Sequence, residues 1–194
     1  MKRIALTGGV GCGKSTLARF LVEQGCEVLD ADDVVHQLES SGGAAVTPIL
    51  KTFGPSVLAI GGGIDRPKLG RIVFADPDAR TRLNAIVHPL AKQVMEEWLR
   101  KPDARLRVAV VPLLFEAGWA QGWDAIICMA CQEAEQVRRL IARGLTEADA
   151  RARIAAQMPL AEKIQKADRT IWNDADEGAL RHEAVRLLKW ISEK

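Results

Sequence analysis

Short apolar runs alternate with segments of helical periodicity at the start of the chain. Residues 4–6 are apolar and lead into a glycine-rich segment, after which apolar positions recur at 17, 18, 21 and 22. That spacing predicts a helix over 15–23, preceded by a short strand. Residues 27–29 read Glu-Val-Leu and are followed by Asp30, which predicts a second short strand that ends in a carboxylate. The chain therefore begins with a strand, a loop, a helix and a second strand.

The same alternation returns after Pro102. Residues 108–111 are all apolar, which is typical of a strand buried on both faces of a parallel sheet. The pattern also predicts, in order, a strand at 124–128, a helix at 133–143, a helix that begins at 146, a strand at 169–172 and a closing helix at 177–191. Strands that alternate with helices indicate an α/β fold, with a mostly parallel sheet and helices on both faces.

Helical patterns dominate the middle of the chain, where glycine-rich stretches separate them at 42–43, 54–55 and 61–63. The clearest helix spans about 79–100 and presents one apolar stripe. Pro89 lies inside this helix, and a proline there is expected to kink or restart it. We expect the middle segment to be a helical insert in the α/β core.

Composition limits the size of the core and the kinds of partner. The 194 residues are 48% apolar, which is enough for one substantial core and a small helical appendage. The net charge of +2 provides no field that favours a nucleic-acid partner. The longest apolar stretch, 108–115, is too short for a membrane span, and residues 4–6 are too few for a signal peptide. We expect a cytoplasmic protein without nucleic-acid or membrane partners; the pattern assigns no oligomeric state.

Two of the four cysteines, Cys128 and Cys131, form a Cys-x-x-Cys motif. Such a pair can serve in redox chemistry or in a zinc site, but no second ligand pair follows at zinc-site spacing. The motif also directly follows an apolar run at 125–127. The favoured interpretation is a set of reduced thiols near the end of a buried strand.

The first glycine-rich segment matches a phosphate-binding motif in full. Residues 8–15 read GGVGCGKS, which fits G-x-x-x-x-G-K-[ST], and they lie between a predicted strand and a predicted helix as that motif requires. Glycines let backbone N–H groups turn inward around a phosphate, and the start of the helix adds partial positive charge. Lys14 is expected to reach the β- and γ-phosphates of ATP, and the Ser15 hydroxyl to bind Mg²⁺.

Carboxylates follow two of the predicted strands. Asp30 and Asp32 come after the second strand, and a kinase needs a carboxylate there to orient an acceptor hydroxyl and take its proton. Alternation in an extended segment would place both on the same face, so spacing does not rank them, and either could instead cap a helix. Glu116 lies beyond the strand at 108–111, where it could serve a metal or remain a solvated loop charge.

Basic residues recur on the predicted helix at 133–143. Arg139 and Arg143 are four residues apart and are therefore expected on one helix face. Two guanidinium groups in that arrangement could hold a transferring phosphoryl group, and a solvated basic face is the alternative.

Taken together, these segments resemble the dephospho-coenzyme A (dephospho-CoA) kinase family over nearly the whole chain. The matching segments, in family order, are 6–15, 30–32, 86–89, 111–116, 139–143, Gln157 and 167–173. The resemblance implies a P-loop NTPase fold, a three-layer α/β structure with helices on both faces of a parallel sheet, plus a helical acceptor-binding insert and a helical lid. It implies a nucleotide-binding core at 1–30 and 102–194, with the lid at about 138–160, and an acceptor domain at 31–101.

The resemblance also implies the reaction and the residues that perform it. ATP would phosphorylate the ribose 3′-hydroxyl of dephospho-CoA, the last step of coenzyme A synthesis. Asp32 takes the general-base position, and Lys14, Arg139 and Arg143 are the other catalytic residues. The implied nucleotide-binding residues are Gly9, Val10, Gly11, Cys12, Gly13, Lys14, Ser15, Thr16 and Asn173. The implied acceptor-binding residues are Asp32, His88, Leu114 and Glu116. Three residues depart from those usual in the family, namely Cys12, Gly144 and Asp174.

Two other functions compete with this interpretation. A different P-loop kinase, acting on a nucleoside monophosphate or a shikimate-like hydroxyl, fits the same phosphate motif. A GTPase switch or regulatory ATPase belongs to another functional class, and the lack of Asn-Lys-x-Asp anywhere in the sequence argues against the GTPase.

Overall fold

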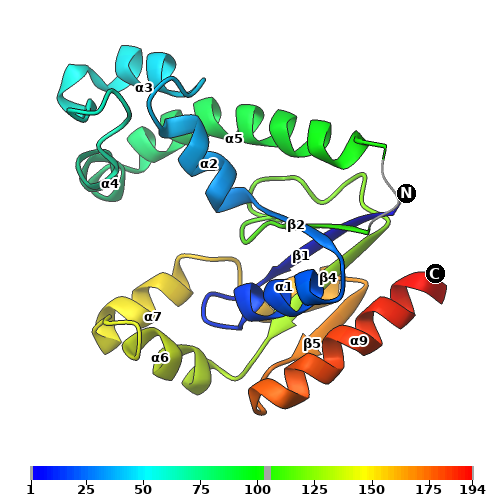
Figure 1. Cartoon of the computed structure of the whole chain (residues 1–194). Coiled ribbons are helices and arrows are strands. Elements are labelled where there is room, and N and C mark those ends of the chain that lie inside the picture. Colours follow the sequence, from blue (N-terminus) through cyan, green and yellow to red (C-terminus); the bar gives the residue numbers. More distant parts are fainter. Residues whose placement is uncertain (1, 103–105, 194) are drawn as a thin grey trace. The chain divides into compact units, whose positions relative to one another are not determined.

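A parallel sheet forms the centre of the structure. In the computed structural model, which describes residues 2–102 and 106–193, five strands form one sheet in the order β2-β3-β1-β4-β5 (Figure 1). The strands are β1 (Arg3–Gly8), β2 (Glu27–Asp30), β3 (Arg107–Val110), β4 (Ala125–Ala130) and β5 (Arg169–Trp172). β1 pairs in parallel with both β3 and β4, and β4 pairs in parallel with β5. The α/β fold expected from the sequence is confirmed.

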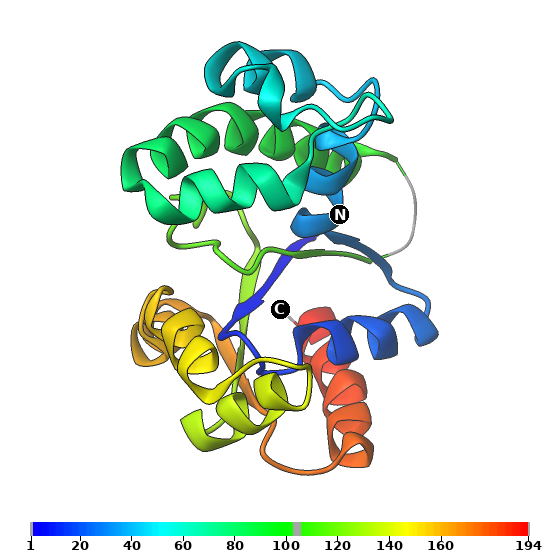
Figure 2. The same cartoon turned by 90° about the vertical axis from the view of Figure 1, so that its left-hand side faces the viewer.

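Strand register places large apolar side chains together on one face of the sheet. Leu6 is paired with Val110 on one side and with Ile127 on the other, and all three are buried in one cluster. Two helices, α1 (Lys14–Glu23) and α9 (Glu177–Glu193), contribute apolar side chains to that cluster. They lie together on one side of the sheet in Figure 2. The periodicity of these two helices predicted this face of the core.

The helices that follow β4 are α6 (Glu133–Ile141), α7 (Glu147–Ala155) and α8 (Leu160–Lys166). From β1 the chain crosses over β3 to β2 at one edge of the sheet, whereas from β4 it continues to β5 at the other edge. Since parallel crossovers are right-handed, α1 and α8 belong to opposite faces. α8 contacts β1 and β4, whereas α6 and α7 pack against each other.

The chain divides into two compact units, one formed by residues 1–29 with 103–194 and the other by residues 30–102. The second unit is helical, as the sequence predicts. It contains α2 (Ala31–Glu39), α3 (Val46–Phe53), a short 3₁₀ helix at Pro55–Val57, α4 (Arg66–Ala75) and α5 (Pro77–Arg100). α2 and α4 both pack against α5, whose buried positions include Val87, Ala91, Met95 and Leu99.

The helix α5 continues through Pro89, so of the two outcomes expected there, a kink or a restart, the restart does not occur. Pro89 is exposed, whereas Val87 and Ala91 on either side of it are buried. The hydrogen bond that a proline removes is therefore lost on the solvent side, where water can replace it, while packing preserves the inner face. Capping fixes the start of the helix, because the Asp76 carboxylate accepts a hydrogen bond from the Asp78 N–H at 2.8 Å.

No helix in the described part of the chain is both long enough and apolar enough to cross a membrane.

A buried ion pair joins the first residues of β2 and β3. The Arg107 side chain is 2% exposed, and its Nε donates to Glu27 Oε2 at 2.8 Å. A buried cation is tolerable only when a partner compensates its lost hydration, so the pair is expected to fix these strand ends relative to each other.

We expect Arg107→Met to lower the free energy of unfolding by about 3–5 kcal/mol, because the ion pair between Arg107 and Glu27 is then broken. Replacing both residues, Arg107→Met with Glu27→Leu, should recover most of that loss. Urea unfolding of the two variants and the parent measures the difference. A double variant as unstable as the single one would show that the ion pair is not the source of the effect.

Candidate functional site

The segment between β1 and α1 forms a loop that ends in the open start of a helix. Gly13 is the N-cap of α1 and has a positive φ of 93°. Within the described residues, no side chain caps this helix start and no acidic residue lies in its first turn. The backbone N–H groups and the positive end of the helix dipole therefore remain uncompensated by protein, which is the arrangement that binds phosphate.

Lys14 and Ser15 lie where the phosphate motif predicts them, at the start of α1. The Lys14 ammonium donates to the carbonyl oxygens of Gly8 at 3.1 Å and Gly9 at 2.8 Å, so it folds back over the loop. Ser15 is exposed and Thr16 is half-buried. The Lys14 cation expected from the sequence is thus on the loop, and the Ser15 hydroxyl is accessible at the helix start.

Two of the loop glycines leave room for amide side chains from elsewhere in the chain. A Cβ atom on Gly9 would lie 2.3 Å from Gln136 Nε2, and one on Gly13 would lie 2.2 Å from Asn173 Nδ2. The Asn173 amide donates to the Cys12 carbonyl oxygen at 3.0 Å. The phosphate motif requires these glycines so that the backbone can approach a phosphate. The structure adds a second requirement, because the Gln136 and Asn173 amides pack so closely against the loop that a Cβ atom would collide with them.

Arg139 also contacts the loop. Its guanidinium donates to the carbonyl oxygens of Gly11 at 3.3 Å and Asn173 at 2.8 Å, and its Nε donates to Glu135 at 2.6 Å. Hydrogen bonds from Arg138 and then Arg139 lower the pKa of Glu135 to about 2. Arg139 is therefore bonded to protein on three sides and supports the loop from below.

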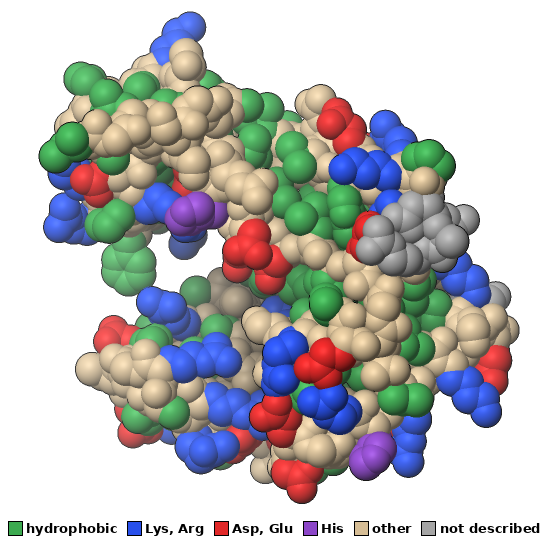
Figure 3. Space-filling model, viewed as in Figure 1, with side chains coloured by type: hydrophobic (Ala, Val, Ile, Leu, Met, Phe, Trp, Pro, Cys, Tyr) green, Lys and Arg blue, Asp and Glu red, His purple; other side chains and the backbone are tan. Residues whose placement is uncertain are grey.

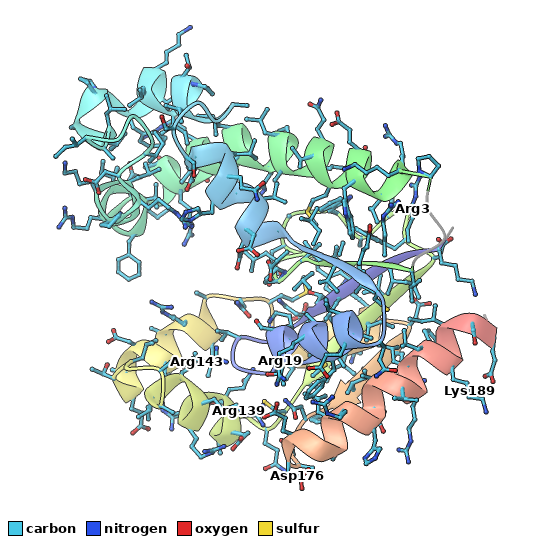
Figure 4. The ribbon with its side chains drawn as sticks, viewed as in Figure 1. Arg3, Arg19, Arg139, Arg143, Asp176 and Lys189 are labelled. Carbon is cyan, nitrogen blue, oxygen red and sulfur yellow. The ribbon has the colours of Figure 1, made fainter. Side chains whose placement is uncertain are left out.

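Arg143 differs from the expectation. The helix α6 ends at Ile141, and Gly144, with a φ of 92°, donates its N–H to the Ile141 carbonyl oxygen at 2.9 Å to close the turn. Arg143 thus lies in the turn that follows the helix, and Gly144 closes this turn with its positive φ. Figure 4 labels both arginines.

Exposed arginines gather on α6, α7 and the turn between them, and Figure 3 shows this concentration of positive side chains. Arg138 pairs with Glu135, and Arg151 pairs with Glu133 and Glu147. In the part of the chain that the structure describes, no acidic side chain forms an ion pair with Arg143. This guanidinium can therefore bind an incoming phosphate without breaking an ion pair there.

Glu116 lies in a network rather than in open solvent. Its Oε1 is 2.7 Å from the ammonium of Lys163, which is fully buried, and accepts a hydrogen bond from Met158 N–H at 3.0 Å. Lys163 also donates to the Pro112 carbonyl oxygen at 3.0 Å. No sequence pattern singled out Lys163, which lies three residues after Leu160 on α8 and is the buried residue of that helix. Leu114, expected at the acceptor, is fully buried, so its side chain serves packing in this conformation.

The thiol of Cys131 contacts Cys12 of the phosphate loop, and not Cys128, the other member of the Cys-x-x-Cys motif. All four cysteines are buried free thiols. The Cys131 thiol donates to Cys12 Sγ at 3.4 Å, and this contact lowers the pKa of Cys12 to about 7, assisted by Gln136 and Lys14. Cys131 lies on the same face of the sheet as Met129, whereas the alternation of side chains along the strand places Cys128 on the other face. Burial raises the pKa of Cys128 to about 12.

Asp30, the last residue of β2, and Asp32 have different surroundings in the unit formed by residues 30–102. Asp30 is the N-cap of α2, and its Oδ1 accepts a hydrogen bond from Asp32 N–H at 2.9 Å. The expectation that both side chains share one face of an extended segment is wrong, because α2 begins at Ala31. Asp30 therefore has the capping role, while the Asp32 side chain is exposed. His88, on α5, is half-buried, and burial lowers its pKa.

Mg²⁺ would need ligands beyond the protein at this loop. Among the described residues, no group of three or more His, Cys, Asp or Glu side chains could hold a metal ion. An exposed hydroxyl at Ser15 beside a phosphate-binding helix start fits the usual Mg²⁺ site of nucleotide enzymes, in which phosphate oxygens and waters complete the coordination.

Comparison with known proteins identifies the relatives of this chain. The family model for dephospho-CoA kinase matches residues 2–178. A dephospho-CoA kinase of Geobacillus kaustophilus is 42% identical over 190 residues, which cover 96% of this chain and 94% of that protein. The solved dephospho-CoA kinase from Campylobacter jejuni superposes with a TM-score of 0.77 at 27% identity, covering 100% of this chain and 98% of that one.

Shikimate kinase from Acinetobacter baumannii shares the fold, with a TM-score of 0.56 at 20% identity, over 100% of this chain and 94% of that one. That similarity shows the fold alone. The full-length matches distinguish between the kinases considered from the sequence, and the family expected there is confirmed. The chain belongs to the dephospho-CoA kinase family and is an ATP-dependent phosphotransferase.

Proposed function

We propose that the chain transfers the γ-phosphate of ATP to the ribose 3′-hydroxyl of dephospho-CoA, in the cytoplasm, as the last step of coenzyme A synthesis. The observation that carries this proposal is the phosphate loop, with an uncapped helix start and the Lys14 ammonium 2.8 Å from a loop carbonyl oxygen. Family membership supports the choice of acceptor. In this proposal the substrates are small molecules, and neither nucleic acid nor a membrane takes part.

The loop would bind ATP through its backbone. The N–H groups at the start of α1 point to the phosphates, and Lys14 exchanges its two loop carbonyl partners for β- and γ-phosphate oxygens. Mg²⁺, held by the Ser15 hydroxyl and phosphate oxygens, would neutralise charge that develops during transfer. Asn173 and Arg139 keep the loop backbone in place from below.

The two arginines would act differently. Arg139 stabilises the loop through the Gly11 and Asn173 carbonyl oxygens and would gain a phosphate contact when ATP binds. Arg143, in the exposed turn of the proposed lid segment 138–160, would bind the transferring phosphoryl group when that turn closes over ATP.

Asp32 would serve the acceptor. As the acceptor oxygen bonds to the γ-phosphorus, the bond to the bridging oxygen breaks and ADP leaves. The proton of the hydroxyl passes to a carboxylate, for which Asp32 is exposed and available, whereas Asp30 caps the helix. His88 and the helical unit at 30–102 are proposed to contact the rest of dephospho-CoA.

We expect Lys14→Ala to lower kcat/KM by at least about 10²-fold, because the β- and γ-phosphates lose their cation. The fold should persist, since the Lys14 side chain contributes little to the core. ADP release with Mg-ATP and dephospho-CoA measures the effect, and Lys189→Ala, which removes an exposed lysine of α9, is the matched control. Activity within a few-fold of the parent would exclude this loop as the ATP site.

Ser15→Ala should raise the Mg²⁺ concentration that gives half-maximal activity by about tenfold or more, because the metal loses a protein ligand. Titrating MgCl₂ at fixed ATP measures the shift, with Ser192→Ala on α9 as the control hydroxyl. An unchanged Mg²⁺ dependence would remove Ser15 from the metal site.

Asp32→Asn should lower kcat by about 10²–10⁴-fold while the affinities for ATP and dephospho-CoA stay near those of the parent, because asparagine keeps the shape but accepts no proton. Asp30→Asn should stay within a few-fold of the parent, since asparagine caps a helix about as well as aspartate. Steady-state kinetics of the two variants decide between them. Loss confined to the Asp30 variant would reverse the assignment.

A further inference from the structure

Val10, near the tip of the phosphate loop, is held by the chain at both of its backbone polar groups. Its N–H donates to Gln157 Oε1 at 3.1 Å, and its carbonyl oxygen accepts from Gln136 Nε2 at 3.0 Å. The backbone identifies the amide atoms, since an N–H requires an oxygen and a carbonyl requires an N–H. One glutamine acts as an acceptor and the other as a donor.

The Val10 side chain is held as well. It packs against the small apolar cluster formed by Val137, Leu140 and Ala150 of α6 and α7. With the two glutamines, this packing fixes the side chain, the N–H and the carbonyl of a single residue that lies between Gly9 and Gly11.

Each glutamine is itself anchored. Gln136 is 3% exposed on α6, and its Nε2 lies 3.1 Å from Cys12 Sγ, beneath the loop. Gln157 lies in the turn between α7 and α8, where the next residue, Met158, donates its N–H to Glu116. Glu116 is in turn paired with the buried Lys163. The polar groups that reach Val10 therefore come from fixed positions rather than from mobile surface side chains.

We propose that Gln136 and Gln157 are positioning residues for ATP binding, which hold the phosphate loop in its binding conformation before ATP arrives. A glycine-rich loop has many backbone conformations, and ordering them costs free energy that would otherwise be subtracted from ATP affinity. The two glutamines, together with the packing of Val10, restrict the loop in advance. This inference rests on the proposed role of the loop in ATP binding, and it makes the α6–α7 segment part of the support of that loop.

The donor and acceptor roles permit a test with nearly isosteric variants. In Gln157→Glu a carboxylate oxygen still accepts from Val10 N–H, so we expect the KM for ATP to stay within about threefold of the parent. In Gln136→Glu the donor is lost and two oxygens face each other, so we expect that KM to rise roughly tenfold. Gln157→Leu, which removes the acceptor, should raise it by about fivefold. kcat and the KM for dephospho-CoA should change by less than about twofold, because the loop serves ground state and transition state alike.

The two Glu variants carry the same added charge, and Gln165→Glu on the exposed surface of α8 adds that charge away from the loop. If Gln136→Glu does not fold, Gln136→Met replaces it. Amide exchange of Val10, followed by NMR without nucleotide, provides a readout besides activity: it should be slow in the parent and faster in Gln157→Leu.

Equal increases in KM for Gln136→Glu and Gln157→Glu would assign the effect to charge and overturn the proposal. A fall in kcat with unchanged KM would assign the glutamines to overall stability and would overturn it as well, as would unprotected exchange of Val10 in the parent. Lys14→Ala separates this proposal from the one on which it rests. If Lys14→Ala is inactive while the glutamine variants bind ATP normally, the loop is the ATP site and the positioning role is wrong.

Discussion

The phosphate loop has to keep a defined shape with almost no side chains of its own. Glycines at 9, 11 and 13 allow the backbone to turn its N–H groups inward, and the same glycines deprive the loop of contacts that would fix it. The missing restraint comes from outside the loop. Gln136, Arg139 and Asn173 donate to its carbonyl oxygens, and Gln157 accepts from Val10. Much of the architecture after β4 serves to bring these side chains to one place.

The sequence predicted those parts of the structure that depend on local pattern. The five strands, α1 and α9 follow from hydrophobic periodicity, and the phosphate loop follows from a motif whose residues are adjacent in the chain. The support of the loop was not predictable in this way. Val10 and Gln157 are far apart in sequence, and Lys163 bonds to Pro112 and Glu116 only because α8 crosses the sheet. Such contacts are set by topology, which periodicity does not describe.

The local errors also have physical causes. The end of α6 was placed two residues late because the terminating glycine, Gly144, contributes through its backbone conformation rather than through hydrophobic pattern. Of the kink or restart expected at Pro89, the restart did not occur, because tertiary packing held the buried face of the helix. Asp30 and Asp32 do not share one face of an extended segment, because α2 begins at Ala31 and Asp30 caps it. In each case a capping or packing contact outweighed the conformation that the local sequence pattern favours on average.

The anchoring of Val10 to α6 and α7 also couples the affinity for ATP to the local stability of these two helices. ATP binding and local unfolding of α6 and α7 belong to one thermodynamic cycle. If the docked helices increase the affinity for ATP, bound ATP must therefore stabilise the helices against local unfolding by the same free energy. A substitution deep in the Val137–Leu140–Ala150 cluster can therefore weaken nucleotide binding without touching the nucleotide. Docking of α6 and α7 on the loop and binding of ATP are therefore coupled equilibria, in which each favours the other.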